Sequence, residues 1–215
     1  DASGLLQMIV VQFRFGQTDE AKASFARAMK NEGRNLILQS LQSIAAQENL
    51  IAAGLESVLR SRRIDDEQRA AALEARIEQL KESREAAQQL IDWIITEQPD
   101  AWELLMIRAE GALLEQRFND AAADLTEVAA LATQQQYERM LRVMANRTTS
   151  LASRSRTEST SSLERLRTRI PIWETILDVF PDNVYALTQM KYTQGRLADW
   201  EQAAAWLQRL AHTTL

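Results

Sequence analysis

Apolar residues recur at spacings of three and four along almost the whole chain, and this periodicity limits the possible folds more than any other feature. Side chains three and four positions apart share one face of an α-helix, so the pattern indicates amphipathic helices. One such face is formed by Leu5, Leu6, Ile9, Val10 and Phe13. The six Gly and three Pro in 215 residues are too few for the frequent turns of a β-sheet protein. We therefore expect an all-α fold of helices in antiparallel pairs.

The residue types that carry most metal and nucleophilic chemistry are scarce. The chain has no Cys and a single His, His212, which excludes thiolate chemistry, a His-based zinc site and a Ser-His-Asp triad. Paired carboxylates occur at Asp65-Asp66 and at Glu110 with Glu115, but no second feature converges on them. No apolar run reaches the roughly 18 residues of a membrane span. We expect a non-enzymatic protein without a cofactor or metal, and the sequence does not specify its compartment.

Three segments share one helix–turn–helix pattern, over residues 1–33, 100–133 and 182–212. In the first, Gly16 precedes Ala21, Phe25 and Ala28. The second has Gln116 in the place of that glycine, and the third has Gly195 followed by a longer turn before Ala203. The segments resemble tetratricopeptide repeats, in which a Gly opens the turn and small Ala residues let two helices approach closely.

This resemblance implies an α-solenoid over residues 1–215, forming a single domain that we expect to be part of a longer chain. It also implies a concave face made by the first helix of each pair, binding a partner peptide or amphipathic helix. In that register the face would carry Leu6, Val10, Phe13, Met106, Glu110, Leu113, Tyr185, Gln189 and Tyr192.

The middle of the chain, residues 35–97, has two heptad-like seams separated by a short polar turn. We expect a long helical hairpin, in which the polar seam positions Glu48 and Arg84 face each other and are partly desolvated. The alternative is a turn at residues 81–83, which would make the following segment the second helix of another repeat.

Residues 135–180 are expected to form irregular helices around a Ser/Thr-rich stretch at 148–162, which we expect to be a loop or a frayed helix end, because Ser and Thr are poor residues for a helix interior. Arginines are concentrated in the same region. The candidates for a partner surface are Arg139, Arg142, Arg154 and Arg156. Such a cluster suits an acidic protein partner or phosphate groups.

The leading hypothesis is therefore a protein–protein interaction scaffold. One alternative is a structural or self-associating spacer, in which the hairpin makes the contacts and a homo-oligomer forms. A less favoured alternative is nucleic-acid binding through the arginines of residues 139–169, because few aromatic residues accompany them.

Overall fold

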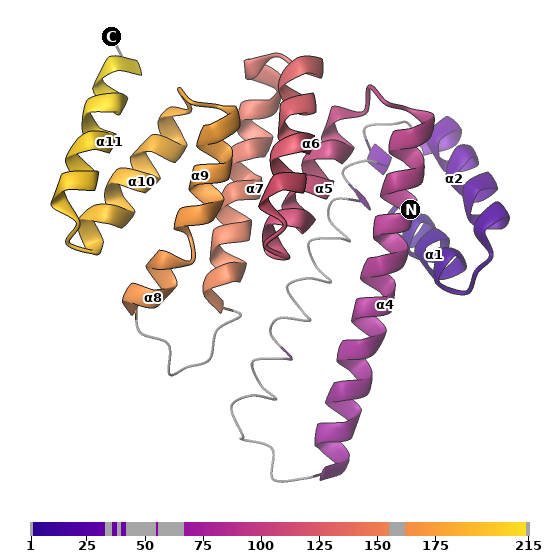
Figure 1. Cartoon of the computed structure of the whole chain (residues 1–215). Coiled ribbons are helices and arrows are strands. Elements are labelled where there is room, and N and C mark those ends of the chain that lie inside the picture. The colour runs from indigo at the N-terminus through magenta and orange to yellow at the C-terminus, as the bar shows by residue number, and fades with distance from the viewer. Residues whose placement is uncertain are drawn as a thin grey trace. The chain divides into compact units, whose positions relative to one another are not determined.

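The computed structural model describes residues 2–32, 36–37, 40–41, 55, 67–154 and 162–213. All regular structure in these ranges is helical (Figure 1), which confirms the all-α class. The chain divides into two compact units, Asp1–Leu104 and Leu105–Leu215. A single domain and a solenoid arrangement stay predictions. Within the described ranges, no helix combines the length and apolar character that crossing a membrane requires.

The first unit is organised around α1 (Ala2–Arg14), which packs against α2 (Thr18–Glu32) and α4 (Glu67–Glu97). α2 also meets α4, where the ring of Phe25 lies edge-on to that of Trp93 with centroids 5.7 Å apart. Aromatic pairs favour this geometry because the positive ring edge faces the negative ring face.

Helix α4 runs without a break from Glu67 to Glu97. The continuous helix is therefore confirmed, and the alternative turn at residues 81–83 is wrong. Seam positions on either side of Arg84, such as Leu80 and Ala87, are buried, but Arg84 itself is exposed, so its expected desolvation is wrong. Glu48 lies outside the described residues. Its contact with Arg84 stays a prediction.

The second unit holds most of α5 and all later helices. Their bounds are α5 (Trp102–Leu114), α6 (Phe118–Leu131), α7 (Gln134–Arg154), α8 (Ser162–Arg167), α9 (Ile170–Val179), α10 (Val184–Arg196) and α11 (Trp200–Thr213). α6 packs on α9, α9 on α10, and α10 on α11, as Figure 1 shows. Pro171 lies in the first turn of α9, where its missing N–H would have no helical partner.

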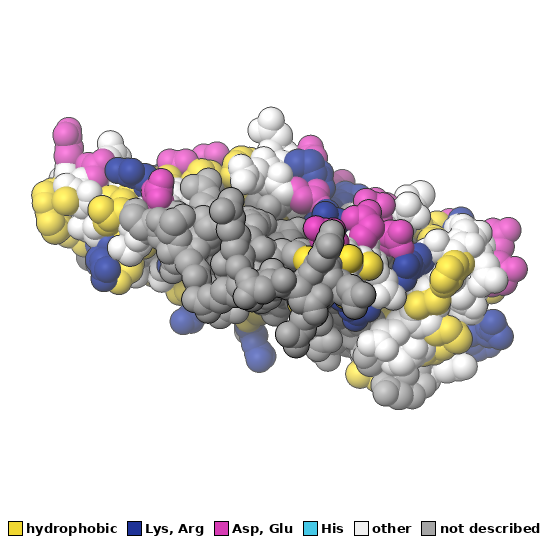
Figure 2. Space-filling view, turned by 90° about the horizontal axis from the view of Figure 1, so that it is seen from below, with side chains coloured by type: hydrophobic (Ala, Val, Ile, Leu, Met, Phe, Trp, Pro, Cys, Tyr) yellow, Lys and Arg dark blue, Asp and Glu magenta, His cyan; other side chains and the backbone are white. Residues whose placement is uncertain are grey.

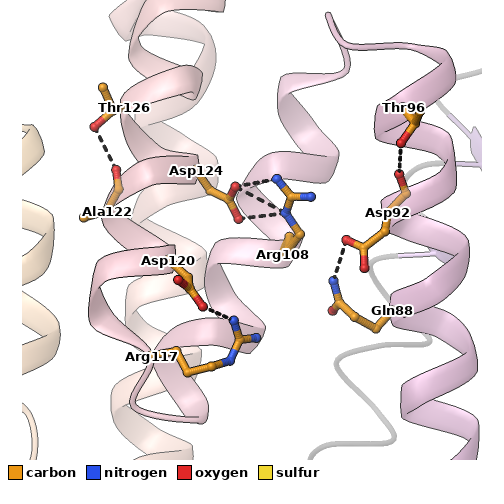
Figure 3. A network of polar contacts seen from close by, with 9 residues as sticks. All are labelled: Gln88, Asp92, Thr96, Arg108, Arg117, Asp120, Ala122, Asp124 and Thr126. Carbon is orange, nitrogen blue, oxygen red and sulfur yellow. Dashed lines mark hydrogen bonds and ion pairs between the residues drawn. The ribbon is translucent and has the colours of Figure 1, made fainter.

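Helices α5 and α6 are tied together by an ion pair between Arg108 and Asp124 (Figure 3). Nε and Nη2 of Arg108 both donate to the carboxylate of Asp124, at 3.0 and 2.6 Å. The forked guanidinium matches the two carboxylate oxygens, so the pair fixes orientation as well as distance.

The turns within three helix pairs share one set of backbone hydrogen bonds. In the α1–α2 turn, Gly16 N–H donates to the carbonyl of Phe13 and Gln17 N–H to that of Gln12. Gln116 and Ala198 hold the equivalent position in the α5–α6 and α10–α11 turns, with the same bonding three and five residues back. This is the Schellman motif, which satisfies carbonyls left open at a helix C-terminus. All three residues have positive φ, 72° at Gly16 and 61° at Gln116 and Ala198.

The third turn corrects the register expected from the sequence. Gly195 was expected to open a longer turn, but Gly195 lies inside α10 and Ala198 is the left-handed residue. In each pair an alanine follows the left-handed residue by five positions, as Ala203 follows Ala198. The three turns therefore have equal length.

A loop beginning at residue 148 is wrong, because α7 continues to Arg154, so the first half of the stretch 148–162 is a helix end. Thr148 and Thr149 donate their hydroxyl protons to the carbonyls of Met144 and Ala145, each at 2.8 Å. Bonding to the carbonyl four residues back lets a buried threonine satisfy its hydroxyl within the helix. Residues 155–161 lie outside the described part of the chain.

Candidate protein-binding surface

Side chains of α7 and α10 meet on the surface of the second unit. The guanidinium of Arg142 lies over the ring of Tyr185, with Cζ 4.7 Å from the ring centroid. The hydroxyl of Tyr185 donates a hydrogen bond to Oδ1 of Asn146. Arg142 and Asn146 are four residues apart, so one face of α7 presents both to Tyr185. The negative face of an aromatic ring attracts a cation, which stabilises this arrangement.

Tyr185 is held from a third helix as well. The ring of Trp173 on α9 meets it at an interplanar angle of 75°, with centroids 5.8 Å apart. Trp173 is buried, whereas Tyr185 is half-buried. The tyrosine therefore has a packed base and an accessible side, and its ring orientation is fixed by contacts from α7 and α9.

We call this surface the α7–α10 face. Its members lie three or four residues apart on one side of their helix, and none of them is buried. They are Arg139, Arg142, Val143, Asn146, Tyr185, Gln189 and Tyr192. Val143 is 49% exposed and Tyr192 is 51% exposed, so apolar surface lies beside the guanidinium groups. Arg196 extends the positive charge along α10, because its Cζ lies 5.9 Å from the centroid of the Tyr192 ring.

A largely buried ion pair between Glu110 and Arg147 joins α5 to α7. Nε and Nη2 of Arg147 each donate to one carboxylate oxygen of Glu110. Burial raises the pKa of Glu110 above its ordinary value, and the hydrogen bond and positive charge of Arg147 oppose that rise. The desolvated carboxylate thus depends on Arg147, and the pair acts as a structural link.

Six of the residues predicted to line a partner-binding surface are buried inside the protein. They are Leu6, Val10, Phe13, Met106, Glu110 and Leu113. The apolar stripes of α1 and α5 face inward, because burying each large apolar side chain stabilises the fold by about 1.5–3 kcal/mol. As placed here, these residues form the core and the internal ion pair, and they do not line an accessible surface.

Other predicted residues come together on the α7–α10 face. Arg139 and Arg142 are exposed on α7, and Tyr185, Gln189 and Tyr192 share one side of α10. The two groups were predicted on separate grounds, the first from local charge and the second from repeat register. Arg154 ends α7, but its side chain, like the whole of Arg156, lies outside the described residues.

Sequence reasoning missed Asn146 as a member of this surface, and it missed the pairing of Arg147 with Glu110. The i, i+4 spacing of Arg142 and Asn146 on a helix could have found the first, but no local spacing links Arg147 to Glu110 on another helix. The Ser/Thr-rich stretch obscured the i, i+4 spacing, because Ser and Thr from residue 148 onward hid the full length of α7.

The groups on this face are guanidinium, phenol and amide, which suit the binding of carboxylates or phosphates. Within the described parts of the chain, no three His, Cys, Asp or Glu side chains are grouped so that they could hold a metal ion. Comparisons with protein families, with curated proteins and with solved structures find no match to this chain.

Proposed function

We propose that this protein is a non-enzymatic interaction scaffold whose α7–α10 face binds an extended acidic segment of a partner protein. The observation that carries the proposal is the contact of Arg142 with Tyr185, supported by Asn146 and Trp173. It brings a cation, a hydrogen-bonding phenol and apolar surface together on two helices. An acidic peptide with intervening apolar residues is complementary to that combination.

Local charge supports an acidic partner. Arg139, Arg142 and Arg196 are exposed on this side of α7 and α10, against the single exposed acid Glu138 in the same part of α7. An excess of exposed positive charge accelerates encounter with an acidic segment and disfavours basic ones. Binding of this kind weakens as the salt concentration rises.

The repeated turns support a helical-repeat scaffold. Three helix pairs use the same Schellman hydrogen bonds, and each places an alanine five residues after the left-handed position. Stacked pairs with a constant turn present their first helices side by side, which is how repeat proteins build extended binding surfaces. In this proposal α7 and α10 are first helices of successive pairs.

The test is selection of a phage-displayed library of random linear peptides on the immobilised protein. We expect enriched sequences to combine Asp or Glu with aromatic or aliphatic residues. Fluorescence anisotropy should then show that Arg139→Glu/Arg142→Glu raises the dissociation constant of an enriched peptide by at least about tenfold.

The matched control is Arg27→Glu/Lys30→Glu, which also reverses two exposed positive charges, but on α2 of the first unit. It should leave the dissociation constant nearly unchanged. The proposal is wrong if no acidic peptide is enriched, or if the double variant and the control bind equally. Displacement of the peptide by a generic RNA at low salt would instead favour nucleic-acid binding.

A further inference from the structure

Helix α11 has two apolar faces, of which one packs on α10 and the other is exposed. The first face packs against α10 and contains the half-buried residues Ala203, Trp206 and Leu210. None of the α11 side chains is fully buried. Figure 2 shows hydrophobic side chains gathered at the outer edge of the second unit, at the left of the view, where Figure 1 places α11.

The second face is a row of four exposed residues, which we call the outer stripe. Its members are Trp200, Ala204, Leu207 and Ala211. Trp200 is 71% exposed and Leu207 is 51% exposed. The spacings of four, three and four keep all four residues on one side of the helix.

The outer stripe is complementary to itself when it is reversed. Large and small residues alternate, and the four positions are symmetric about the point between Ala205 and Trp206. In an antiparallel copy, Trp200 therefore faces Ala211, and Ala204 faces Leu207. Placing each large side chain opposite a small one is the arrangement that fills the space between two packed helices.

We propose that a second copy of this chain docks on the outer stripe, so that two α11 helices pack antiparallel about a twofold axis. This inference does not depend on the proposed peptide-binding function. A twofold interface uses the same patch on both subunits, which requires a self-complementary surface such as this one.

Charge at the two ends of α11 supports the antiparallel direction. Glu201 lies in the first turn and His212 in the last turn, on the same flank of the outer stripe. An antiparallel copy brings the Glu201 carboxylate beside the His212 imidazole of the other copy, at both ends of the interface. It also places the two helix dipoles in opposite directions, which a parallel pair would not do.

The expected dimer is weak, because one pair of helices buries less surface than a typical stable interface. The first test is analytical ultracentrifugation over a roughly hundredfold range of protein concentration. We expect reversible dimers in the unaltered chain. Leu207→Glu or Ala204→Glu should raise the dissociation constant by at least about tenfold, because each places a charge in the apolar contact.

Two controls make the result specific. Ala205→Glu adds the same charge one position off the outer stripe and should leave the dimer intact. Phe15→Glu removes an exposed apolar side chain of the first unit. Phe15 forms a second exposed apolar stripe with Met8 and Val11, which could also carry a dimer contact.

The proposal is overturned if the unaltered chain is monomeric throughout, if Leu207→Glu still dimerises, or if Phe15→Glu abolishes the dimer. Each variant changes an exposed residue, and circular dichroism would verify folding.

The absence of cysteine allows a direct test of direction. Trp200→Cys mixed with Ala211→Cys should form an intermolecular disulfide under mild oxidation, because these positions face each other in the antiparallel pair. Trp200→Cys alone should form far less, since its two copies would lie about 16 Å apart along the helix axis. Equal cross-linking in both samples would overturn the antiparallel arrangement.

Discussion

The left-handed position of the helix-pair turn is occupied by three different residue types. Gly16 adopts positive φ without steric cost, whereas Gln116 and Ala198 hold φ of 61° despite a Cβ. In these two residues the Cβ lies close to the following carbonyl, which costs about 1–2 kcal/mol. The Schellman hydrogen bonds are present in all three turns, so the surrounding structure imposes the conformation.

Gln116→Gly should therefore stabilise the protein. Removing the steric cost is partly offset by the greater backbone freedom of glycine in the unfolded chain, and we expect a net gain of about 0.5–1 kcal/mol. Urea unfolding measures this. Gln89→Gly, at an exposed position in the middle of α4, serves as the control and should destabilise, because glycine in a helix interior costs about 1 kcal/mol. A loss of stability at Gln116 would mean that its backbone is not left-handed.

The Glu110–Arg147 pair makes stability depend on pH. Because the pKa of Glu110 is raised in the folded protein, the folded state binds this proton more tightly than the unfolded chain does. The stabilising contribution is therefore present below the ordinary pKa and is lost as the pH rises through the raised value. Arg147 limits that loss by opposing the rise.

Removing the arginine should enlarge the pH effect. We expect Arg147→Met to cost about 3–5 kcal/mol near neutral pH, because a buried carboxylate is left without its partner. The cost should shrink towards about pH 5, as protonation of Glu110 becomes easier. Urea unfolding at both pH values measures the difference. Glu110→Leu/Arg147→Met should recover most of the lost stability, and an equal cost at both pH values would contradict the assignment.

At the scale of elements, the helix pairs depend on small residues where two helices cross. Ala21 is fully buried in the first pair, and Ala121 is fully buried at the matching position of the α5–α6 pair. A larger side chain at these positions would separate the helices or force strained rotamers, since protein interiors are closely packed.

Ala21→Trp should accordingly destabilise the protein by overpacking, by about 1–3 kcal/mol. Ala23→Trp is the matched control, because Ala23 is exposed on the same helix and has room for the indole. Thermal unfolding followed by circular dichroism compares the two. If both variants melt like the parent chain, the crossing is not at Ala21.

At the scale of the whole molecule, periodicity was enough to predict the helical class, because amphipathic spacing reflects burial directly. It was also enough for the unbroken helix through residues 81–83, where no Gly, Pro or Asn interrupts the pattern.

The binding surface was harder to predict than the helices. The spacing of Leu6, Val10 and Phe13 shows that one face of α1 is apolar, but it does not distinguish a core from a binding surface. Only packing against α2 and α4 decides that question.

The helical class can be checked in solution. Far-ultraviolet circular dichroism should give a helix content far above the usual third of residues in globular proteins. The described residues support this expectation, since their regular structure is helical throughout. A measurable sheet signal from the full chain would contradict it.

The shared turn has a consequence for how such helix pairs can be recognised in a sequence. Its geometry is held by backbone atoms, so Gly, Gln and Ala all preserve it at a modest energetic cost. A substitution at the left-handed position therefore removes the glycine by which such a turn is recognised in a sequence, but it leaves the geometry of the turn unchanged. Helix pairs of this kind are therefore found more reliably from their backbone hydrogen bonds than from a glycine in their sequence.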